Sequence, residues 1–449
     1  MSDEGQRKIP TSKVKRAAKI VGTSVKVGGN YVKYYSKKAF DRNLSKDSLH
    51  NDNAEDIYET LSELKGSALK VAQMMSMDDQ VLPKAYQDKF SMSQYNAPPL
   101  SYPLIAKTFK QHLGESPESI FTTFTKKAVN AASIGQVHKA TLGDKTLAVK
   151  IQYPGVADSI SSDLKLVKPL AGRLFNMKTA DLNMYLEEVE SKLIEETDYE
   201  LELKRSQEIT ADCAHLEGLV FPTYYNEFSS RRILTMDWIE GKLFTDFVKT
   251  EADPKIKNEI GQYMWDFFLF QMRDLRKVHA DPHPGNFIIT PENKLAVLDF
   301  GCVKEIPEKF ALNYFQLLRP NILKEEKDLN QIYEAMEFFR PEDKPEIKGK
   351  LREVYQSLIA VLAQPFHSDT FDFGDDAYFK KIFEMGDSFS KDKTLRKINS
   401  ARGSRDAIYV MRTFFGLYNL LHQLKANVKL NYPLYAPSES PKGFIPKAS

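Results

Sequence analysis

The apolar positions along the chain predict an N-terminal helical region, then a group of short strands. From Asp56 to Met77, apolar residues recur every three or four positions, which places them on one face of a helix. Another helical stretch is expected near Leu104 to Leu113. The pattern then changes to short strands around Ser133 to Ala140 and Thr146 to Ile151.

The second half of the chain has the pattern of a mainly helical region. One long helix is expected from about Asp181 to Cys213, followed by strands around Arg232 to Trp238. Beyond Gly241 the pattern is mainly helical, apart from short strands at Phe287 to Thr290 and Leu295 to Leu298. Strands grouped in one region and helices in another predict an α+β fold.

A length of 449 residues is too great for one simple core and suits a two-lobed unit with an extension. The parts that we expect are an arm at 1–45, a helical extension at 46–118, a first lobe at 119–240 and a helical second lobe at 241–449. No stretch approaches the roughly eighteen apolar residues of a membrane-spanning helix. The only cysteines, Cys213 and Cys302, exclude a disulfide framework and favour a reducing compartment, the cytoplasm or an organelle matrix.

Charge is unevenly distributed, although the net charge is only +2. The segment from Gly5 to Phe40 holds ten Lys and Arg, no Asp or Glu, and several valines and isoleucines in a weakly amphipathic arrangement. Such an arm can lie on an anionic membrane surface, where each basic residue contributes about 1 kcal/mol. A disordered, solvated tail and an organelle transit peptide are the alternatives, and nucleic acid is not an expected partner.

The strongest chemical signal is the run from His279 to Asn286 (HADPHPGN), which precedes an apolar strand ending in Asp299-Phe300-Gly301. An Asp with an Asn five residues later, followed by a strand that ends in Asp-Phe-Gly, is typical of the catalytic and metal loops of kinases. Asn286 and Asp299 offer the oxygen ligands that Mg²⁺ prefers, and Asp281 can orient or deprotonate a nucleophile. The sequence therefore predicts binding of ATP and Mg²⁺.

A second Asp-Phe-Gly begins at Asp372 and lacks these surroundings. It follows the polar run His367 to Thr370, and no Asp-x-x-x-x-Asn lies upstream at the matching distance. We interpret it as a coincidental loop sequence.

The run Leu147 to Lys150 (LAVK) has the form of the strand motif whose lysine holds the α- and β-phosphates of ATP. Lys150 should therefore have an acidic partner on a helix. On an acidic helical run further along the chain, Asp198 and Glu202 are one turn apart and share a face, whereas Glu196 would point elsewhere. Glu202 is the expected partner, and a solvated helix face is the alternative for each acid.

The segment expected to cover the nucleotide differs from that of ordinary kinases. Aligned with a G-x-G-x-x-G-x-V hairpin, the run Asn130 to Val137 (NAASIGQV) keeps only Gly135 and Val137. Alanine restricts the backbone and brings a Cβ toward the phosphates, so the loop cannot form the same close cradle. The residues expected to bind the nucleotide are Ala131, Ala132, Ser133, Gly135, Val137, Lys150, Glu202, Met236 and Trp238.

Several of these segments together resemble the UbiB family of atypical kinase-like proteins. They are the runs Asn130 to His138 (NAASIGQVH), Glu196 to Asp198 (ETD), His279 to Asn286 (HADPHPGN) and Lys70 to Gln73 (KVAQ). In that family an alanine-rich loop replaces the glycine-rich one, and an N-terminal helix bears a Lys-x-Gly-Gln signature. The resemblance covers about Asp56 to Leu421, and Ala72 stands where the signature has Gly.

The resemblance implies a two-lobed, protein-kinase-like fold with an N-terminal helical extension packed over the active site. Lys70 and Gln73, which the helical pattern alone would place on a solvated face, would then act as regulatory residues near Glu196 and Asp198. The resemblance also implies Mg-ATP binding and ATPase activity linked to membranes. Support of isoprenoid quinone (ubiquinone-type) biosynthesis or lipid homeostasis follows, with a quinone precursor or lipid as a further partner.

Sequence after the metal loop argues against an ordinary protein kinase. Helical sequence resumes near Pro307 without an Ala-Pro-Glu motif, and Ala280 stands where an Arg would read an activation-loop phosphate. A small-molecule kinase of the choline or aminoglycoside type is one alternative, and a nucleotide-binding, lipid-responsive scaffold without catalysis is another. The presence of all four kinase-type residues argues against a scaffold: Lys150, Asp281, Asn286 and Asp299.

Overall fold

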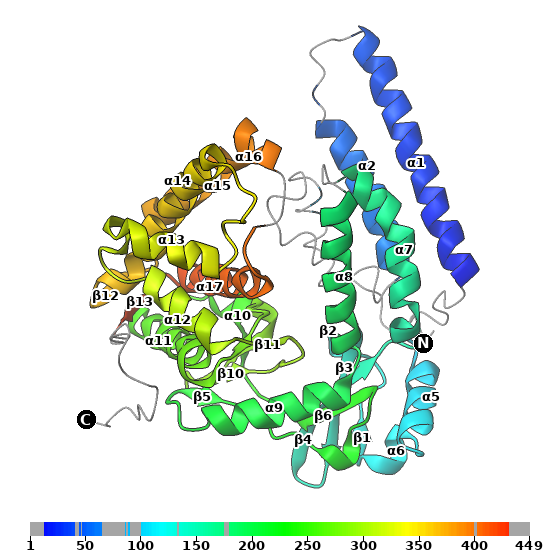
Figure 1. Cartoon of the computed structure of the whole chain (residues 1–449). Helices are drawn as coiled ribbons and strands as arrows, with labels where there is room; N and C mark the ends of the chain where they lie inside the picture. The colour runs from blue at the N-terminus through cyan, green and yellow to red at the C-terminus, as the bar shows by residue number, and fades with distance from the viewer. Residues whose placement is uncertain are drawn as a thin grey trace. The chain divides into compact units, whose positions relative to one another are not determined.

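A computed structural model gives the structure of the chain and describes residues 13–40, 45, 47–64, 86, 89, 100–132, 134–174, 179–398 and 402–430. The chain divides into two compact units (Figure 1). Each unit has its own hydrophobic core. The first unit consists of Met1–Gln207 and Thr223–Trp238, and the second of Glu208–Pro222 and Ile239–Ser449.

The first unit is built on an antiparallel sheet with the strand order β1-β3-β4-β6, in which β2 also pairs with β3. The strands are β1 (Thr123–Phe124), β2 (Asn130–Ala132), β3 (Gly135–Leu142), β4 (Lys145–Gln152) and β6 (Ile233–Asp237). The central strand β4 is buried from Leu147 to its end, because β3 and β6 flank it on both sides. Helix α5 (Tyr102–His112) contributes Phe109, whose ring packs edge-on against Phe121 and Phe124.

The other helices of the first unit are α1 (Lys13–Phe40), α2 (Asp47–Leu64), α6 (Pro117–Ile120), α7 (Val156–Leu174), α8 (Thr179–Glu196) and the start of α9 (Tyr199–Cys213). A short 3-10 turn at Asn226–Phe228 precedes β6. Helix α1 packs on α2 and α7. Arg16 of α1 and Asp163 of α7 form a buried ion pair with Nε–Oδ1 and Nη2–Oδ2 distances of 2.7 and 2.5 Å. The alternative of a disordered N-terminal tail is therefore wrong for residues 13–40, where an internal ion pair and an apolar face hold the helix in the unit.

The second unit combines many helices with short strands. Its strands are β5 (Leu219–Val220), β7 (Lys242–Leu243), β8 (Lys277–His279), β9 (Phe287–Ile289), β10 (Leu295–Val297), β11 (Val303–Glu305), β12 (Thr370–Asp372) and β13 (Asn427–Lys429). They form sheets with the order β5-β10-β9-β7 and the pairs β11-β8 and β12-β13. Only the β5–β10 pair is parallel among these described strands.

The helices of the second unit surround a core centred on Trp265, which is almost completely buried. They are α10 (Phe244–Phe247), α11 (Pro254–Phe270), α12 (Glu308–Leu317), α13 (Glu326–Ala335), α14 (Pro345–Leu362), α15 (Asp376–Lys391), α16 (Lys393–Ile398) and α17 (Arg405–Leu424). Helix α11 passes into a π-helical turn at Gln271–Leu275 that leads to β8. Within the described ranges, no helix is long and apolar enough to cross a membrane.

The predicted α+β class is confirmed, and two parts of the element prediction need correction. The long helix expected from Asp181 to Cys213 is broken into α8 and α9 at Thr197 and Asp198. Asp198 accepts a 3.1 Å hydrogen bond from the backbone N–H of Leu201, so it caps the new helix. Helix α7 and the strands β1, β2, β5, β7, β8 and β11 to β13 were not anticipated by the apolar pattern.

Candidate functional site

Lys150 lies near the end of the central strand β4 of the first unit. It is opposite Val137 of β3 and Leu234 of β6, and its side chain is 8% exposed. The Lys150 Nζ donates to Glu202 Oε1 at 2.8 Å, and Nζ also lies 5.0 Å from the centre of the Tyr199 ring. The expected contact between Lys150 and Glu202 is present, and both charged groups are buried.

The break between α8 and α9 separates the acids that the sequence placed on one helix. Glu196 is the last residue of α8, Asp198 precedes α9 as its cap, and Glu202 lies in the first turn of α9. Glu196 and Glu202 lie on different helices, so the spacing argument for one continuous helix does not apply to them. The Asp198 carboxylate is used in part by the cap, which adds a structural role to the expected regulatory one.

The alanine-rich segment forms one arm of a hairpin with β3. Ala131 is opposite Gln136, and Ala132 is opposite Gly135. A Cβ on Gly135 would lie 2.3 Å from the backbone oxygen of Ile151, so only glycine fits where the hairpin approaches β4. Of the remaining residues expected here, Val137 lies in β3 and Ser133 lies outside the described residues.

Met236 and Trp238 lie on or next to β6. Met236 is opposite Ala148 and is 7% exposed. The Trp238 backbone N–H donates to the Thr146 oxygen at 2.9 Å, and Lys139 Nζ lies 4.6 Å from the centre of the Trp238 ring. Both residues are therefore part of the same sheet as Lys150.

A buried hydrogen-bond chain behind the hairpin was missed by the sequence reasoning. The backbone N–H of Leu100 donates to Gln136 Oε1 at 2.7 Å, so the Gln136 Nε2 must donate to His138 Nε2, 2.8 Å away. His138 then donates from Nδ1 to the Thr125 oxygen at 2.6 Å. Burial lowers the pKa of His138, and the hydrogen bond to Thr125 opposes this effect only in part. The imidazole is thus held neutral with its proton on Nδ1.

In the second unit, the loop that carries Asp281 is held by backbone contacts on both sides. It follows β8, and the Ala280 N–H donates to the Cys302 oxygen at 2.9 Å, extending the pairing of β8 with β11. At the other end, the Leu298 N–H donates to the Asn286 oxygen at 3.1 Å. The loop is therefore tied to the segment on each side of Asp299.

His279 adds hydrogen bonds from its side chain and its backbone to this connection. Its Nε2 lies 2.5 Å from the backbone oxygen of Asp299, and its backbone N–H donates to Gln271 Oε1 at 2.7 Å. Complete burial lowers the pKa of His279, whereas the nearby Asp281 and Asp299 carboxylates raise it. The neutral ring donates from Nε2, because a backbone oxygen can only accept.

Asn286 and Asp299 carry oxygen atoms suited to a divalent cation. Asp299 Oδ1 accepts a 2.8 Å hydrogen bond from the Gly301 N–H. Asn286 Nδ2 donates to the backbone oxygen of Asp281 at 3.0 Å. The described residues contain no group of three or more His, Cys, Asp or Glu that could hold a metal. This donor set fits Mg²⁺, which binds one or two protein carboxylates and takes its other ligands from water and phosphate.

Arg412 on α17 is a neighbour of Asp281 that the sequence did not reveal, because the two are 131 positions apart. Its Nη2 lies 3.5 Å from Asp281 Oδ1, and the side chains are 29% and 23% exposed. Pro282 packs on the same helix, since a Cβ on Gly416 would lie 2.2 Å from Pro282 Cγ. Helix α17 thus fixes the position of the Asp281 loop.

Only the first residue of the second Asp-Phe-Gly lies in a strand, and Phe373 and Gly374 form the turn that follows, so the loop interpretation is wrong for Asp372 alone. Asp372 ends β12, which pairs with β13 from Thr370↔Lys429 to Asp372↔Asn427. Phe373 is fully buried in the core, and Asp372 Oδ1 accepts from the Gly374 N–H at 2.8 Å. The local turn resembles that at Asp299, but its strand belongs to a different sheet from β8 to β10.

Lys70 and Gln73, the predicted regulatory residues of the N-terminal extension, lie outside the described residues. Their relationship to Glu196 and Asp198 stays a prediction.

Residues 92–334 match the family model of the ABC1 atypical kinase-like domain. The chain is 27% identical over 456 residues to "Probable serine/threonine-protein kinase abkA" of Dictyostelium discoideum, covering 94% of this chain and 78% of that protein. It is 30% identical over 404 residues to "Atypical kinase COQ8B, mitochondrial" of Danio rerio, covering 84% and 61%. Identity to "Atypical kinase COQ8, mitochondrial" of Saccharomyces cerevisiae is 29% over 385 residues, covering 83% and 75%.

A solved structure has a similar fold. It is entitled "The complex structure of Rv3197-erythromycin from Mycobacterium tuberculosis" and matches with a TM-score of 0.58 and 25% identity, covering 86% of this chain and 96% of that one. Together with the family match, this similarity confirms the kinase-like part of the predicted fold.

Proposed function

The chain belongs to the family of ABC1 atypical kinase-like proteins, also called the UbiB family, and we propose that it binds Mg-ATP and hydrolyses it at a membrane surface. The observation that carries this proposal is the buried ion pair between Lys150 and Glu202, 2.8 Å apart on a central strand and a neighbouring helix. A buried ammonium is costly unless it is paired, and a kinase-type lysine needs such a partner to be positioned for phosphate oxygens.

Each charged group has a role that its position supports. Lys150 binds the α- and β-phosphates, with Glu202 fixing its side chain. Asn286 and Asp299 hold Mg²⁺, which neutralises charge on the phosphates when bound. Asp281 orients the attacking nucleophile, and Arg412 steadies its carboxylate at 3.5 Å.

Water is a better candidate than a peptide as the nucleophile. Helix α12 begins at Glu308, seven residues after Gly301, so little chain follows the metal loop to form a peptide platform. Ala280 has only a methyl group where an arginine would bind a phosphorylated activation loop, and its backbone is used in pairing with Cys302. Both features support ATP hydrolysis over protein phosphorylation, with a choline- or aminoglycoside-type small-molecule kinase as the alternative.

Helix α1 supports the membrane part of the proposal. Val21, Val25, Val32 and Tyr35 recur along one face of this helix and are 57–70% exposed, whereas Ile20, Val27 and Tyr34 on another face are buried. Helix α1 contains no acidic residue, and lysines such as Lys26 and Lys33 border the exposed apolar face. An apolar stripe beside lysines fits the interface of an anionic bilayer.

The metabolic role that we propose is support of isoprenoid quinone biosynthesis or lipid homeostasis, as the UbiB resemblance implies. Two relatives are named mitochondrial, which favours an organelle matrix with peripheral attachment to a membrane. The proposed partners are accordingly ATP, an anionic membrane surface, and a quinone precursor or other lipid.

Calorimetric titration with ATP tests the nucleotide proposal directly. We expect the chain to bind ATP in the presence of Mg²⁺, and we expect Lys150→Met to abolish the binding heat. Lys249→Met is the matched control, because that lysine belongs to an exposed surface pair. Equal ATP affinity in the wild type and Lys150→Met would refute the proposed role of Lys150.

A further inference from the structure

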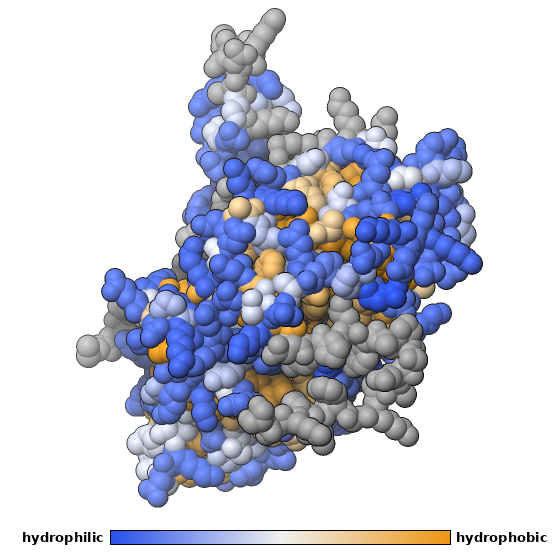
Figure 2. Space-filling view, turned by 90° about the vertical axis from the view of Figure 1, so that its left-hand side faces the viewer, coloured by the Kyte–Doolittle hydropathy of each residue, from blue (hydrophilic) through white to orange (hydrophobic). Residues whose placement is uncertain are grey.

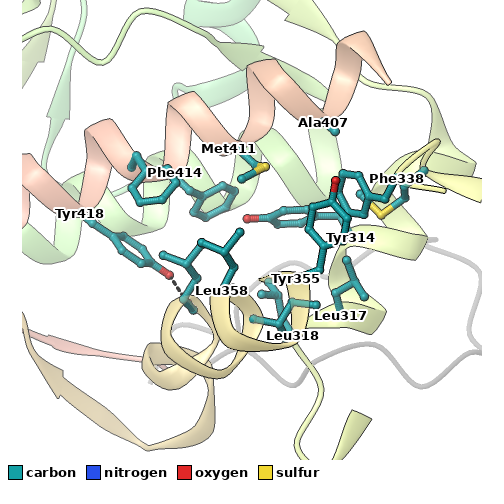
Figure 3. Close-up of a pocket in the computed structure, with 14 residues that line it drawn as sticks. Tyr314, Leu317, Leu318, Phe338, Tyr355, Leu358, Ala407, Met411, Phe414 and Tyr418 are labelled. Atoms are coloured by element: carbon teal, nitrogen blue, oxygen red, sulfur yellow. Dashed lines mark hydrogen bonds between the residues drawn. The ribbon is translucent and has the colours of Figure 1, made fainter. Parts of the chain in front are cut away.

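A pocket in the second unit lies among α12, α14 and α17 (Figure 3). Its empty space of about 660 Å³ includes a part that is open to solvent. None of its 14 lining residues is charged. Figure 2 looks onto the side of Figure 1 on which α12 to α15 lie, and hydrophobic residues reach the surface there among hydrophilic ones.

The pocket wall is apolar but includes tyrosine hydroxyls. Tyr314 reaches from α12 into the space between α14 and α17, and its ring stacks on Phe414 at a centroid distance of 5.4 Å (Figure 3). The Tyr418 hydroxyl is already used, because it donates to the Leu362 oxygen at 2.9 Å. Burial raises the pKa values of Tyr314 and Tyr355, and no hydrogen bond of either hydroxyl to a described residue contributes. These two phenols can therefore serve a bound molecule.

Helix α17 connects the pocket to the Asp281 loop. Met411 and Phe414 line the pocket from one side of the helix. Arg412 and Gly416, one turn apart on the adjacent side, contact Asp281 and Pro282. One rigid helix thus carries both sets of residues, so a shift of its pocket side also moves the groups that hold the loop.

The start of α17 has a second connection, through the segment that follows Asp299. Asp406 accepts from Lys304 of β11 at 2.8 Å, and both side chains are largely shielded from solvent. Because β11 pairs with β8, this ion pair ties α17 to the strand that leads into the Asp281 loop.

We propose that this pocket binds an uncharged, largely apolar molecule with one hydroxyl, carbonyl or N–H group, and that the bound molecule acts on the Asp281 loop through α17. The absence of charge in the described lining excludes an ionic ligand on desolvation grounds, and Tyr314 supplies the hydrogen bond that orients the ligand. This site goes beyond the proposed function, since none of its residues belongs to the nucleotide-binding set.

Fluorescence titration of the full chain with N-phenyl-1-naphthylamine tests the binding step. This neutral probe carries one N–H group and brightens in apolar surroundings. We expect saturable binding that is about tenfold weaker in Met411→Trp and in Leu358→Trp, because each added indole occupies the pocket. The matched control is Phe383→Trp, at an apolar position that is 64% exposed outside the pocket.

Tyr314→Phe removes only the hydroxyl and keeps the ring, so it tests the site if either tryptophan variant fails to fold. We expect it to weaken probe binding while the melting temperature stays close to that of the wild type. Probe affinity unchanged in Tyr314→Phe and in the folded tryptophan variants would overturn the proposed site.

Hydrogen exchange tests the connection to the loop without requiring nucleotide turnover. The probe should change amide exchange in residues 279–286 of the wild type and leave it unchanged in Leu358→Trp. Tight binding of the probe without any change in amide exchange in residues 279–286 would overturn the proposed action through α17. Both readouts are independent of ATP, so failure of the nucleotide proposal would not affect them.

Discussion

The side-chain amide of Asn286 donates a 3.0 Å hydrogen bond to the backbone oxygen of Asp281. This contact fixes which way the amide faces, since its nitrogen is committed to the loop and its oxygen is left to accept or to ligate. The contact spans the five-residue interval of the motif, and a 3-10 turn at Pro284–Asn286 brings Asn286 back toward Asp281.

Asp299→Asn should abolish Mg-dependent nucleotide binding, because an amide is a much weaker ligand for a hard cation than a carboxylate. Asp372→Asn is the matched control, since Asp372 has the same turn but ends a strand of a different sheet. Titration with ATP and Mg²⁺ measures both variants. Equal losses of affinity would contradict the assignment of the metal loop to Asp299.

Glu202→Gln should lower the free energy of unfolding by about 3–5 kcal/mol, because it removes the carboxylate from the buried Lys150 ammonium. The double variant Lys150→Met/Glu202→Leu should lose less than the sum of the single variants, since it removes both charges. Urea unfolding gives each value.

The exposed pair of Lys249 and Asp246 provides the control for this prediction. Its side chains are 73% and 63% exposed, so Asp246→Asn should change stability by no more than about 1 kcal/mol. A similar loss in the free energy of unfolding for Asp246→Asn and Glu202→Gln would show that burial of the Lys150 pair does not increase its contribution to stability.

Local patterns in the sequence identified the elements that depend on neighbouring residues. Helix α5 and strands β3, β4, β9 and β10 were predicted, since their apolar residues follow a regular spacing. The break between α8 and α9 was missed because both sides have helical periodicity, and only the cap at Asp198 marks the end. Strands β8 and β11 to β13 hold one apolar residue each, so they lack the short apolar runs that marked β9 and β10.

The candidate site was predictable where its residues form a motif and unpredictable where they meet through the fold. Lys150 and Glu202 could be proposed as partners from the kinase-like motifs, although they are 52 positions apart. Arg412 could not, because nothing in the helical pattern of α17 distinguishes it from a solvated arginine. Gln136 and His138 are polar residues in a strand whose burial becomes visible only when Leu100 and Thr125 cover them.

The neutral state of His138 predicts a pH dependence of stability. Its folded-state pKa lies below 6.5, so the unfolded chain binds more protons under mildly acidic conditions. The free energy of unfolding should therefore fall as the pH decreases through about 6.5. Protonation would place a second donor opposite Gln136 Nε2 and disrupt the contact with Leu100.

His138→Asn should remove the loss of stability that protonation of His138 causes. The difference in the free energy of unfolding between wild type and variant should therefore shrink from pH 7.5 to pH 5.5. Urea unfolding at the two pH values measures it, and other histidines contribute equally to both proteins. A stability difference that is the same at both pH values would show that His138 titrates alike in the folded and unfolded states.

The exposed face of α1 should determine binding to anionic vesicles. The double variant Val25→Ser/Val32→Ser removes two side chains that are 70% and 69% exposed and should weaken binding about tenfold. Added salt should weaken wild-type binding as well, because surface attraction is screened over about 8–10 Å. Val129→Ser, at another exposed valine, is the control. Binding that is insensitive both to salt and to the α1 changes would place the membrane contact elsewhere.

Release of phosphate from ATP tests the central claim most directly. The purified chain should release phosphate only when Mg²⁺ is present, and Asp281→Asn should reduce the rate about 100-fold or more, because the amide cannot accept a proton from the nucleophile. Asp376→Asn, at a side chain that is 78% exposed, should keep the wild-type rate. Phosphate release that is the same in Asp281→Asn and the wild type, or that is missing from the wild type with Mg²⁺ and anionic vesicles present, would contradict the account.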